Sequence, residues 1–415
     1  MKFSNKKLTL ILPGLGIFIA SYDIAAISVS LLVLKNLWHL TDGIISIVGA
    51  SAFIGAIFGG FFSGILADKY GRKQLLVLDF ITYIIASIGS SLSYNIETLI
   101  LFRILVGIGI GADFTVIFPY LAEVLPVETR GKDMAAIMFT ANFGMVVAYG
   151  LGGIFVTFGP VGWRLVLLFG GIMAIPFMIM RTKIVESGLW IKNRKKGIRD
   201  IVNNFHRREK RNVIVSSIAW FSYQVGDQAL SIFLPLFLFS VLDLNSSYSS
   251  YSSLLIKLIT IPAAFMTVIL INRIGRKPLQ IYGFLGRALG LIGTGIFLIY
   301  FLNISKILII LFLFIAYFFG AVGPDKTIVI APSEQFNTSI RATGQGISES
   351  SGRFGGVVGI ISYGFIVQYF GSGYSIFFLA IFAIVGFIVS RFYMVETNPR
   401  NYTNLNDIEE FGRDV

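Results

Sequence analysis

The stretch Arg103-Ile104-Leu105-Val106-Gly107-Ile108-Gly109-Ile110-Gly111-Ala112-Asp113 decides how the rest of the chain folds. It lies inside an apolar run from about residue 96 to residue 125, and it combines an arginine, three glycines at alternate positions and an aspartate. A carboxylate in lipid is costly unless it is paired, protonated or facing water. Spaced glycines let a neighbouring helix come close. We therefore expect a helix packed inside a membrane bundle, with Asp113 facing an internal cavity.

The composition indicates a protein of the membrane interior. The chain has 415 residues, of which 55% are hydrophobic and only 13% are charged, and its mean hydropathy is +0.79. It has no cysteine, which excludes disulfides and thiolate chemistry, and two histidines, His39 and His206, are too few for a structural zinc site. The net charge of +12 comes largely from basic residues between apolar segments. Lipid headgroups, and not nucleic acid, are therefore the expected partner.

Apolar segments of membrane-spanning length recur along the whole chain. A helix that rises about 1.5 Å per residue needs about 20 residues to cross the hydrocarbon core. Twelve segments meet this requirement, so we predict an all-α membrane protein with twelve transmembrane helices. They lie near residues 8–34, 44–67, 75–94, 97–125, 133–158, 163–183, 213–242, 248–271, 279–302, 305–333, 342–370 and 373–394.

The chain divides into two six-helix halves. We expect an N-terminal half at residues 1–183, a basic cytoplasmic linker at 184–212, a C-terminal half at 213–394 and a cytoplasmic tail at 395–415. Lysines and arginines gather in the loops on one side of the predicted bundle. Because cytoplasmic loops are rich in these residues, both termini are expected in the cytoplasm and the protein in the cell membrane. The linker is expected to touch anionic lipid, with a regulatory partner site as the alternative.

Internal repeats support the division into halves. Asp68-x-x-Gly71-Arg72-Lys73 recurs 204 residues later as Asn272-x-x-Gly275-Arg276-Lys277, and Asp23 and Asp227 have the same separation. Glu123…Arg130 recurs 211 residues later as Glu334…Arg341. Parallel repeats of this kind are typical of transporters whose halves enclose a binding site near the membrane midplane.

The loop sequence Gly64-Ile-Leu-Ala-Asp68-Lys-Tyr-Gly71-Arg72-Lys73 resembles the signature between helices two and three of the major facilitator superfamily. The resemblance implies a loop that latches the two halves together in one state of the transport cycle. A carboxylate such as Asp68 can sit at a helix N-terminus of the other half, where the helix dipole favours negative charge. In the second copy Asn272 replaces the aspartate, which departs from a symmetric latch. The residues expected at this gate are Asp68, Arg72, Lys73, Glu123, Arg130, Arg276, Glu334 and Arg341.

Finer motifs resemble two branches of this superfamily. Pro119-Tyr120-Leu121-Ala122-Glu123 with Arg130-Gly131 is similar to the sugar-porter pattern, although Val185 and Val395 replace its prolines. The glycine-rich stretch ending at Asp113, and the stretch from Gly323-Pro324-Asp325 to Ser351-Gly352-Arg353, are similar to phosphate–proton symporters. The departures from that branch lie at Phe114, Tyr223, Ser231, Asp325 and Arg353. The proton-handling carboxylates are kept while the substrate shell is altered, which supports proton coupling and weakens phosphate as the specific cargo.

Three aspartates, Asp23, Asp113 and Asp227, fall in the middle part of predicted spans and are the candidates for proton coupling. Burial favours the protonated carboxyl group, and a nearby cation favours the ionised one. A cation that approaches and leaves during the transport cycle would therefore load and unload a proton. A fixed ion pair is the alternative at each position. Arg103 lies ten residues before Asp113, about 15 Å along a helix, and is not expected to pair with it.

Further polar residues are candidates for contact with a transported solute. The planar guanidinium of Arg353 can bind a carboxylate or another anion, and a salt bridge to Glu349 or to Asp325 is the alternative. Lys257, near the middle of helix eight, is a second cation, with pairing to Asp227 or snorkelling as alternatives. Arg287 is expected to be structural. The candidate substrate-binding residues are Asn142, Tyr223, Asp227, Lys257, Asp325 and Arg353.

These observations predict a proton-coupled symporter that imports a small polar solute by alternating access. An inorganic or organic anion, such as phosphate or a carboxylate, fits the central basic residues, whereas a sugar fits the Glu/Arg loop motifs. A nutrient sensor that has lost transport is a third reading. The sequence has no nucleophile–base constellation, metal cluster or P-loop, so neither enzyme activity nor a metal, a cofactor or ATP-driven transport is expected. The expected partners are the solute, protons and membrane lipids, and a monomer is expected.

Overall fold

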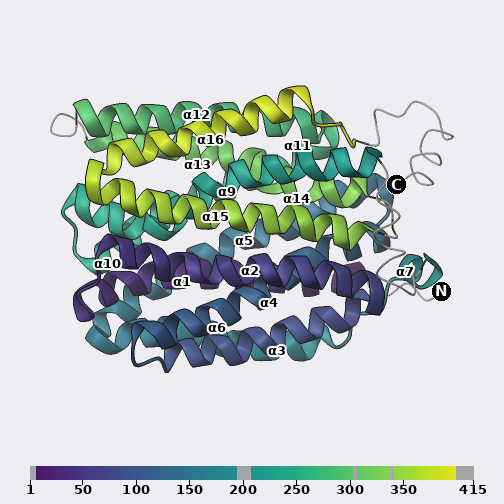
Figure 1. Cartoon of the computed structure of the whole chain (residues 1–415), viewed down its shortest axis with the longest axis horizontal. Helices are drawn as coiled ribbons and strands as arrows, with labels where there is room; N and C mark the ends of the chain where they lie inside the picture. The colour runs from purple at the N-terminus through teal and green to yellow at the C-terminus, as the bar shows by residue number, and fades with distance from the viewer. Residues whose placement is uncertain (1–5, 194–206, 302–305, 337, 339, 399–415) are drawn as a thin grey trace.

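The computed structural model describes residues 6–193, 207–301, 306–336, 338 and 340–398, which form helices joined by short connections, with no strand among them. Ten stretches of these residues are long and apolar enough to cross a membrane. One of the ten, Val127–Arg181, contains two helices, and Arg341–Phe370 is a further helix of 30 residues. The described residues therefore form twelve membrane-length segments, and the predicted all-α membrane fold is confirmed (Figure 1).

The first six segments are continuous helices, and two of them begin at side-chain caps. The side chain of Thr41 accepts from the N–H of Ile44 at the start of the second helix, and Asn95 forms a capping box with Thr98 at the start of the fourth. The helices are α1 (Lys6–Leu37), α2 (Asp42–Tyr70), α3 (Arg72–Ser91), α4 (Ile96–Val124), α5 (Val127–Phe155) and α6 (Gly162–Arg181), with the short 3-10 helix η1 (Val156–Val161) between the last two.

The remaining segments include two broken helices. They are α9 (Arg207–Leu242), α10 (Ser246–Leu258) with α11 (Thr260–Ile274), α12 (Arg276–Tyr300), α13 (Lys306–Val322) with α14 (Pro324–Gln335), α15 (Arg341–Phe370) and α16 (Ser372–Phe392). The sequence predicted uninterrupted spans at 248–271 and 305–333. The structure breaks both, because Pro262 and Pro324 lack an N–H and their rings clash with the carbonyl group four residues earlier.

The predicted linker and tail are described only in part. The short helix α7 (Gly188–Asn193) lies in the linker, and α9 begins at Arg207, so it takes in the last residues of the predicted linker range. Residues 194–206 of the linker and 399–415 of the tail lie outside the described residues.

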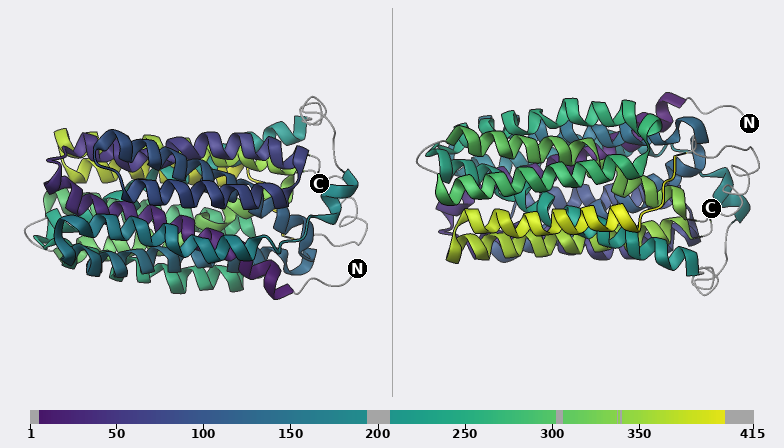
Figure 2. Two further views of the ribbon diagram at one scale, coloured as in Figure 1. Left: turned by 90° about the horizontal axis from the view of Figure 1, so that it is seen from below. Right: turned by 90° about the horizontal axis from the view of Figure 1, so that it is seen from above.

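The helices run side by side along the long axis of the molecule (Figures 1 and 2). The first described helix begins and the last one ends at the same end of the bundle, where α7 also lies. We call this the terminal end, and we call the opposite end, which carries the turn from α1 to α2, the far end. In Figure 1, α3, α4 and α6 lie on one side of the bundle and α12, α13 and α16 on the other. The two sides meet where α2 packs on α15 and where α5 packs on α10 and α11.

The alternating glycines of α4 have the role that their spacing predicts. A Cβ atom added at Gly107 would collide with the carbonyl oxygen of Ala52 in α2, and one added at Gly111 would collide with that of Ala56. Gly55 of α2 makes the reciprocal contact with the carbonyl group of Ile104. Two backbones can lie this close only without side chains between them. The close contact fixes α4 inside the first half, with Asp113 buried.

Candidate functional site

One arginine is shared by two carboxylates in the first half. Arg181, the last residue of α6, pairs with Asp113 of α4 at 2.5 Å and with Asp79 of α3 at 3.3 Å, and all three side chains are buried. Gly16 of α1 makes room for this cluster, because a Cβ atom there would collide with the Arg181 guanidinium and the Asp113 carboxylate. One cation between two carboxylates leaves one negative charge without its own partner. Such a site can hold a proton.

A second ion pair lies further along the same helix. Arg103 of α4 pairs with Asp23 of α1. The expectation that Arg103 does not pair with Asp113 is confirmed. The hydroxyl group of Tyr83 donates to Asp23 at 3.4 Å. Tyr83 also lines a cavity of about 10 Å³ together with Asp79 and Asp113. That volume is close to what one water molecule needs. The side chains of Asp23, Tyr83 and Asp113 therefore form a polar line through the first half.

In the second half, Asp227 of α9 is held by two donors. The hydroxyl group of Tyr223 donates to its Oδ1 at 3.2 Å, and Nη1 of Arg287 in α12 donates to the same oxygen at 3.2 Å. The Arg287 guanidinium also lies 4.7 Å from the centre of the Tyr223 ring. Arg287, which the sequence assigned to structure alone, is therefore a direct partner of a candidate site residue.

Lys257 of α10 is a buried cation with a different surrounding. Its Nζ atom donates to the Ser231 hydroxyl group at 3.1 Å and lies 4.4 Å from the centre of the Tyr317 ring. No described carboxylate is within ion-pair distance of it, so the pairing with Asp227 weighed from the sequence is absent from the described residues. Its neighbours solvate the ammonium group without neutralising it.

The other candidate substrate residues are engaged within their own helices. Arg353 pairs with Glu349 one turn earlier, at 2.5 Å, which is the alternative considered for it. Asp325 pairs with the adjacent Lys326. Asn142 is buried, and its Nδ2 donates to the carbonyl group of Phe139 at 3.3 Å. Of these, Asp325 is the most exposed.

The loop signature places Asp68 against the opposite half. Its Oδ2 accepts from the N–H and the hydroxyl group of Thr343, at 2.8 and 2.6 Å, in the first turn of α15. This is the helix-terminus position that the signature implies. Arg72 bridges Asp68 and Glu123 at 2.9 and 2.8 Å, and Arg341 lies 3.8 Å from Glu123. The N–H of Lys73 donates to Glu186, as does that of Arg72.

The second copy of the signature uses a different bond between the halves. Asn272 donates from Nδ2 to the carbonyl oxygen of Glu128 in α5 at 3.1 Å. Its counterpart Asp68 instead accepts hydrogen bonds from α15. Arg276 pairs with Glu334 at 2.8 Å, within the second half. Arg130 contributes a long bond, 3.5 Å, to the carbonyl group of Leu125. The expected asymmetry of the two latches is present.

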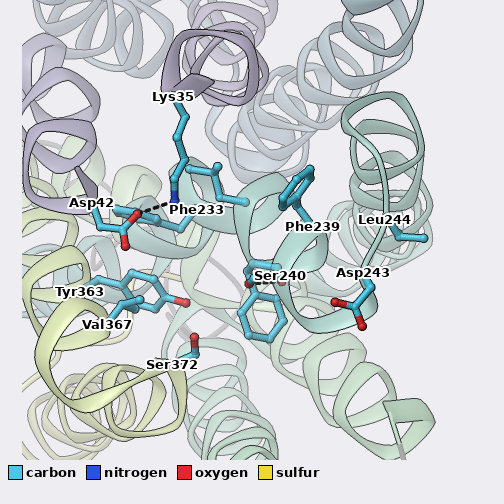
Figure 3. Close-up of a pocket in the computed structure, with 12 residues that line it drawn as sticks. Lys35, Asp42, Phe233, Phe239, Ser240, Asp243, Leu244, Tyr363, Val367 and Ser372 are labelled. Carbon is cyan, nitrogen blue, oxygen red and sulfur yellow. Dashed lines mark hydrogen bonds and ion pairs between the residues drawn. The ribbon is translucent and has the colours of Figure 1, made fainter. Parts of the chain in front are cut away.

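The halves also touch toward the far end. The Tyr149 hydroxyl group of α5 donates to the carbonyl group of Ser231, and Ser250 of α10 donates to that of Tyr149, at 3.0 and 2.7 Å. At the far end, a cavity of about 440 Å³ lies between α1, α2, α9, α15 and the start of α16. Figure 3 shows Lys35 bonded to Asp42, at 2.8 Å, at this cavity, with Tyr363 and Ser372 on the opposite wall. The two halves therefore contact each other toward both ends of the bundle.

Sequence reasoning missed Asp79, Arg181 and the role of Arg287. Arg181 ends a predicted span, where a basic residue reads as an ordinary membrane flank. For Arg287 a signal was available: it lies 204 residues after Tyr83, the same offset that relates Asp227 to Asp23. Tyr83 donates to Asp23, and Arg287 donates to Asp227, so the repeat preserves the geometry while changing the donor.

The described residues form twelve membrane-length helical segments with buried charges along their middle and with polar bonds between two halves, which is the architecture of a membrane transporter. The chain belongs to the Major Facilitator Superfamily, whose family model matches residues 14–324.

Its relatives include two kinds of transporter. It is 26% identical to a putative inorganic phosphate transporter of Oryza sativa subsp. japonica, over 97% of this chain and 92% of that one. It is also 26% identical to an arabinose–proton symporter of Bacillus subtilis, over 81% and 80% of the two chains. The proton:xylose symporter XylE has the same fold, with a TM-score of 0.84 at 20% identity over 96% and 98% of the two chains.

Proposed function

We propose that this protein is a proton-coupled symporter that carries a small anion into the cytoplasm by alternating access, with the terminal end cytoplasmic. The observation that carries the proposal is an opposite charge imbalance in the two halves. Away from the gate, the buried acidic side chains of the first half are Asp23, Asp79 and Asp113, against two arginines, Arg103 and Arg181. The second half has the opposite balance. Its carboxylates are Asp227, Glu349 and the half-buried Asp325, and its four buried cations are Lys257, Arg287, Lys326 and Arg353. The first half therefore has one carboxylate in excess and the second half one cation in excess.

The surplus carboxylate of the first half is the proton site. Asp79 and Asp113 compete for Arg181, so one of them binds a proton at little cost in lost pairing. The polar line through Tyr83 to Asp23 gives the proton a route toward the middle of the bundle. Asp227 faces the equivalent place in the second half and couples the proton to the solute.

The surplus cation of the second half is the anion site. A buried ammonium group without a counter-ion is costly in a membrane. An anionic solute that binds beside Lys257 supplies the missing charge, while the hydroxyl groups of Tyr223 and Ser231 and the side-chain amide of Asn142 donate hydrogen bonds to it. The Asp325 carboxylate, paired with Lys326, only accepts hydrogen bonds and so contacts a donor group of the solute. Arg353 is already neutralised, so it contributes shape and not net charge.

Alternating access then requires that both ends open in turn. Two bonds hold the halves together at the terminal end: Asp68 accepts from Thr343, and Asn272 donates to the carbonyl group of Glu128. The gate residues around these bonds are Asp68, Arg72, Lys73, Glu123, Arg130, Arg276, Glu334 and Arg341. The Tyr149 and Ser250 bonds hold the far end. The protein is proposed to lie in the cell membrane as a monomer.

The test is uptake into proteoliposomes. Labelled phosphate, a monocarboxylate and a pentose are each offered with and without an inward proton gradient. We expect gradient-driven accumulation of an anion by the parent, loss of anion uptake in Lys257→Met, and partial retention in Lys257→Arg, which keeps the charge. Undiminished anion uptake by Lys257→Met would remove the anion site from the proposal.

A sugar–proton symporter is the second candidate. Beside Asp227, Gln228 donates to Gln224 at 2.6 Å, and the Gln228 Oε1 atom has no partner among the described residues. Neutral amides of this kind suit sugar hydroxyl groups. Pentose uptake that survives Lys257→Met would favour this candidate. Binding of any of these solutes without flux would indicate a nutrient sensor.

A further inference from the structure

Glu349 places a buried carboxylate of the second half directly against the first half. Its side chain is fully buried on α15. Its Oε1 accepts from Nε of Arg353 at 2.5 Å, and its Oε2 accepts from the hydroxyl group of Thr115 in α4 at 3.4 Å. A Cβ atom added at Gly60 of α2 would collide with the same Oε2. The carboxylate therefore touches both α2 and α4 across the boundary between the halves.

Its partner Arg353 crosses the same boundary. The guanidinium lies 4.8 Å from the centre of the Phe114 ring in α4 and 5.8 Å from that of Phe53 in α2. Arg353 is buried, and Glu349 is its only described carboxylate partner. Next to the pair, Ser350 donates to the carbonyl group of Ile57 at 2.9 Å. The pair lies within one helix, and it is enclosed by the other half only while α15 stays against α2 and α4.

The pair also adjoins the proposed proton site. Residues 113, 114 and 115 follow one another on α4 and point in directions about 100° apart. Asp113 points to Arg181 inside the first half, Phe114 lies under Arg353, and Thr115 bonds Glu349. If this turn of α4 moves when Asp113 changes its charge, the Glu349–Arg353 pair is affected directly, because Phe114 and Thr115 contact it.

We infer that Glu349 is a positioning residue of the transport cycle: by neutralising Arg353 between the halves, it stabilises the state that is closed at the terminal end. An unpaired guanidinium is poorly tolerated in a dry interface, whereas replacing both members of a buried pair by neutral groups is often harmless. Without Glu349, Arg353 gains hydration when α15 separates from α2 and α4. The open state is then favoured. The inference rests on the alternating access of the proposed function but not on its cargo.

The test measures the opening of the terminal end directly. The natural chain has no cysteine, so spin labels attach only at introduced ones. Lys132 in α5 and Arg273 in α11 are exposed at the terminal end of opposite halves, and Lys132→Cys with Arg273→Cys reports their separation. In this background Glu349→Gln is expected to raise the ratio of open to closed protein at least tenfold. Glu349→Gln with Arg353→Gln is expected to return it to within threefold of the parent.

A second readout separates this role from general damage. With cargo applied at the far end, KM should rise in Glu349→Gln, and with cargo applied at the terminal end it should fall. A structural defect alone would change both KM values in the same direction. Thr115→Val, which alters the contact from the opposite half and leaves the ion pair intact, should shift the open fraction the same way by a smaller factor, even if Glu349→Gln proves unstable.

The inference is overturned if neither Glu349→Gln nor Thr115→Val changes the distance distribution, or if the double variant is as open as the single one. The outcome for the proposed function is read separately. If the parent protein transports normally but the label-to-label distances do not change in the variants, only the role of Glu349 is refuted. If the parent protein moves no solute but the variants change the label-to-label distances as expected, only the proposed symport is refuted.

Discussion

The bond between Thr343 and Asp68 gives the most direct prediction about the gate. Thr343→Val removes the hydroxyl group that donates to Asp68 Oδ2 at 2.6 Å and leaves the N–H that donates at 2.8 Å. The substitution is better suited than one at Asp68, because Asp68 also pairs with Arg72 at 2.9 Å and its loss would disturb the rest of the cluster.

The size of the effect follows from the kind of bond. A hydrogen bond to a charged group contributes about 1.5–3 kcal/mol. Thr343 and Asp68 belong to opposite halves, so this bond is lost whenever the terminal end opens. Its removal should therefore raise the open-to-closed ratio about 10- to 100-fold, since about 1.4 kcal/mol is a tenfold change in an equilibrium constant.

A buried reporter measures this ratio. Met134 of α5 is fully buried, and its sulfur lies 3.9 Å from the Ser333 hydroxyl group of α14, in the opposite half. In Met134→Cys, the only thiol of the protein reacts with a polar reagent when the halves part, at a rate that follows the open population. Thr343→Ser keeps both donors and is the matched control, expected within threefold of the parent. Equal reaction rates for the Val and Ser variants, with both folded, would refute the assignment of Asp68 as a latch.

Three further predictions concern the first half. Asp113→Asn should abolish proton-driven accumulation but spare counterflow exchange, and normal accumulation by this variant in proteoliposomes would exclude Asp113 from coupling. Asp79→Asn should give the same phenotype, because either substitution leaves Arg181 with one permanent carboxylate partner; separable phenotypes would argue against a shared proton. Gly107→Ala should destabilise the protein by about 1–3 kcal/mol, because the added Cβ atom meets the Ala52 carbonyl oxygen, and the loss should appear as a lower melting temperature. Gly14→Ala is the control and should melt close to the parent, because the nearest contact of its Cβ atom is a Thr140 methyl group at 3.3 Å.

Much of the architecture was predictable because it depends on patterns that repeat along the chain. The length of apolar segments predicts the twelve spans, and the glycine spacing predicts that a neighbouring helix, which the structure identifies as α2, comes close to α4. The loop signature predicts that Asp68 reaches a helix terminus of the other half, and it does so at Thr343. Each of these features is local or is duplicated, so a single sequence contains enough information to place it.

The pairing of buried charges was less predictable, since it depends on how the helices are rotated and on how far each side chain extends. Arg181 reaches back from the last residue of α6 to two carboxylates on α3 and α4. Its position at the end of a span gave no sign of this. Lys257 was recognised as a mid-span cation, but the sequence could not show that Asp227 is occupied by Tyr223 and Arg287.

Arg353 and Asn142 show how the repeat itself adds meaning to these positions. They are 211 residues apart, the same offset that relates the two Glu…Arg gate motifs, so they occupy equivalent positions in α15 and α5. The first half uses a neutral amide there, bonded within its own helix, whereas the second half uses a cation that needs Glu349 one turn earlier. The second half therefore carries a charge at this position together with the carboxylate that cancels it. Because the Arg353 guanidinium needs its carboxylate partner most when α2 and α4 bury it, the pair gives the second half a contact whose energy depends on conformation, which the neutral amide at the equivalent position of the first half cannot provide.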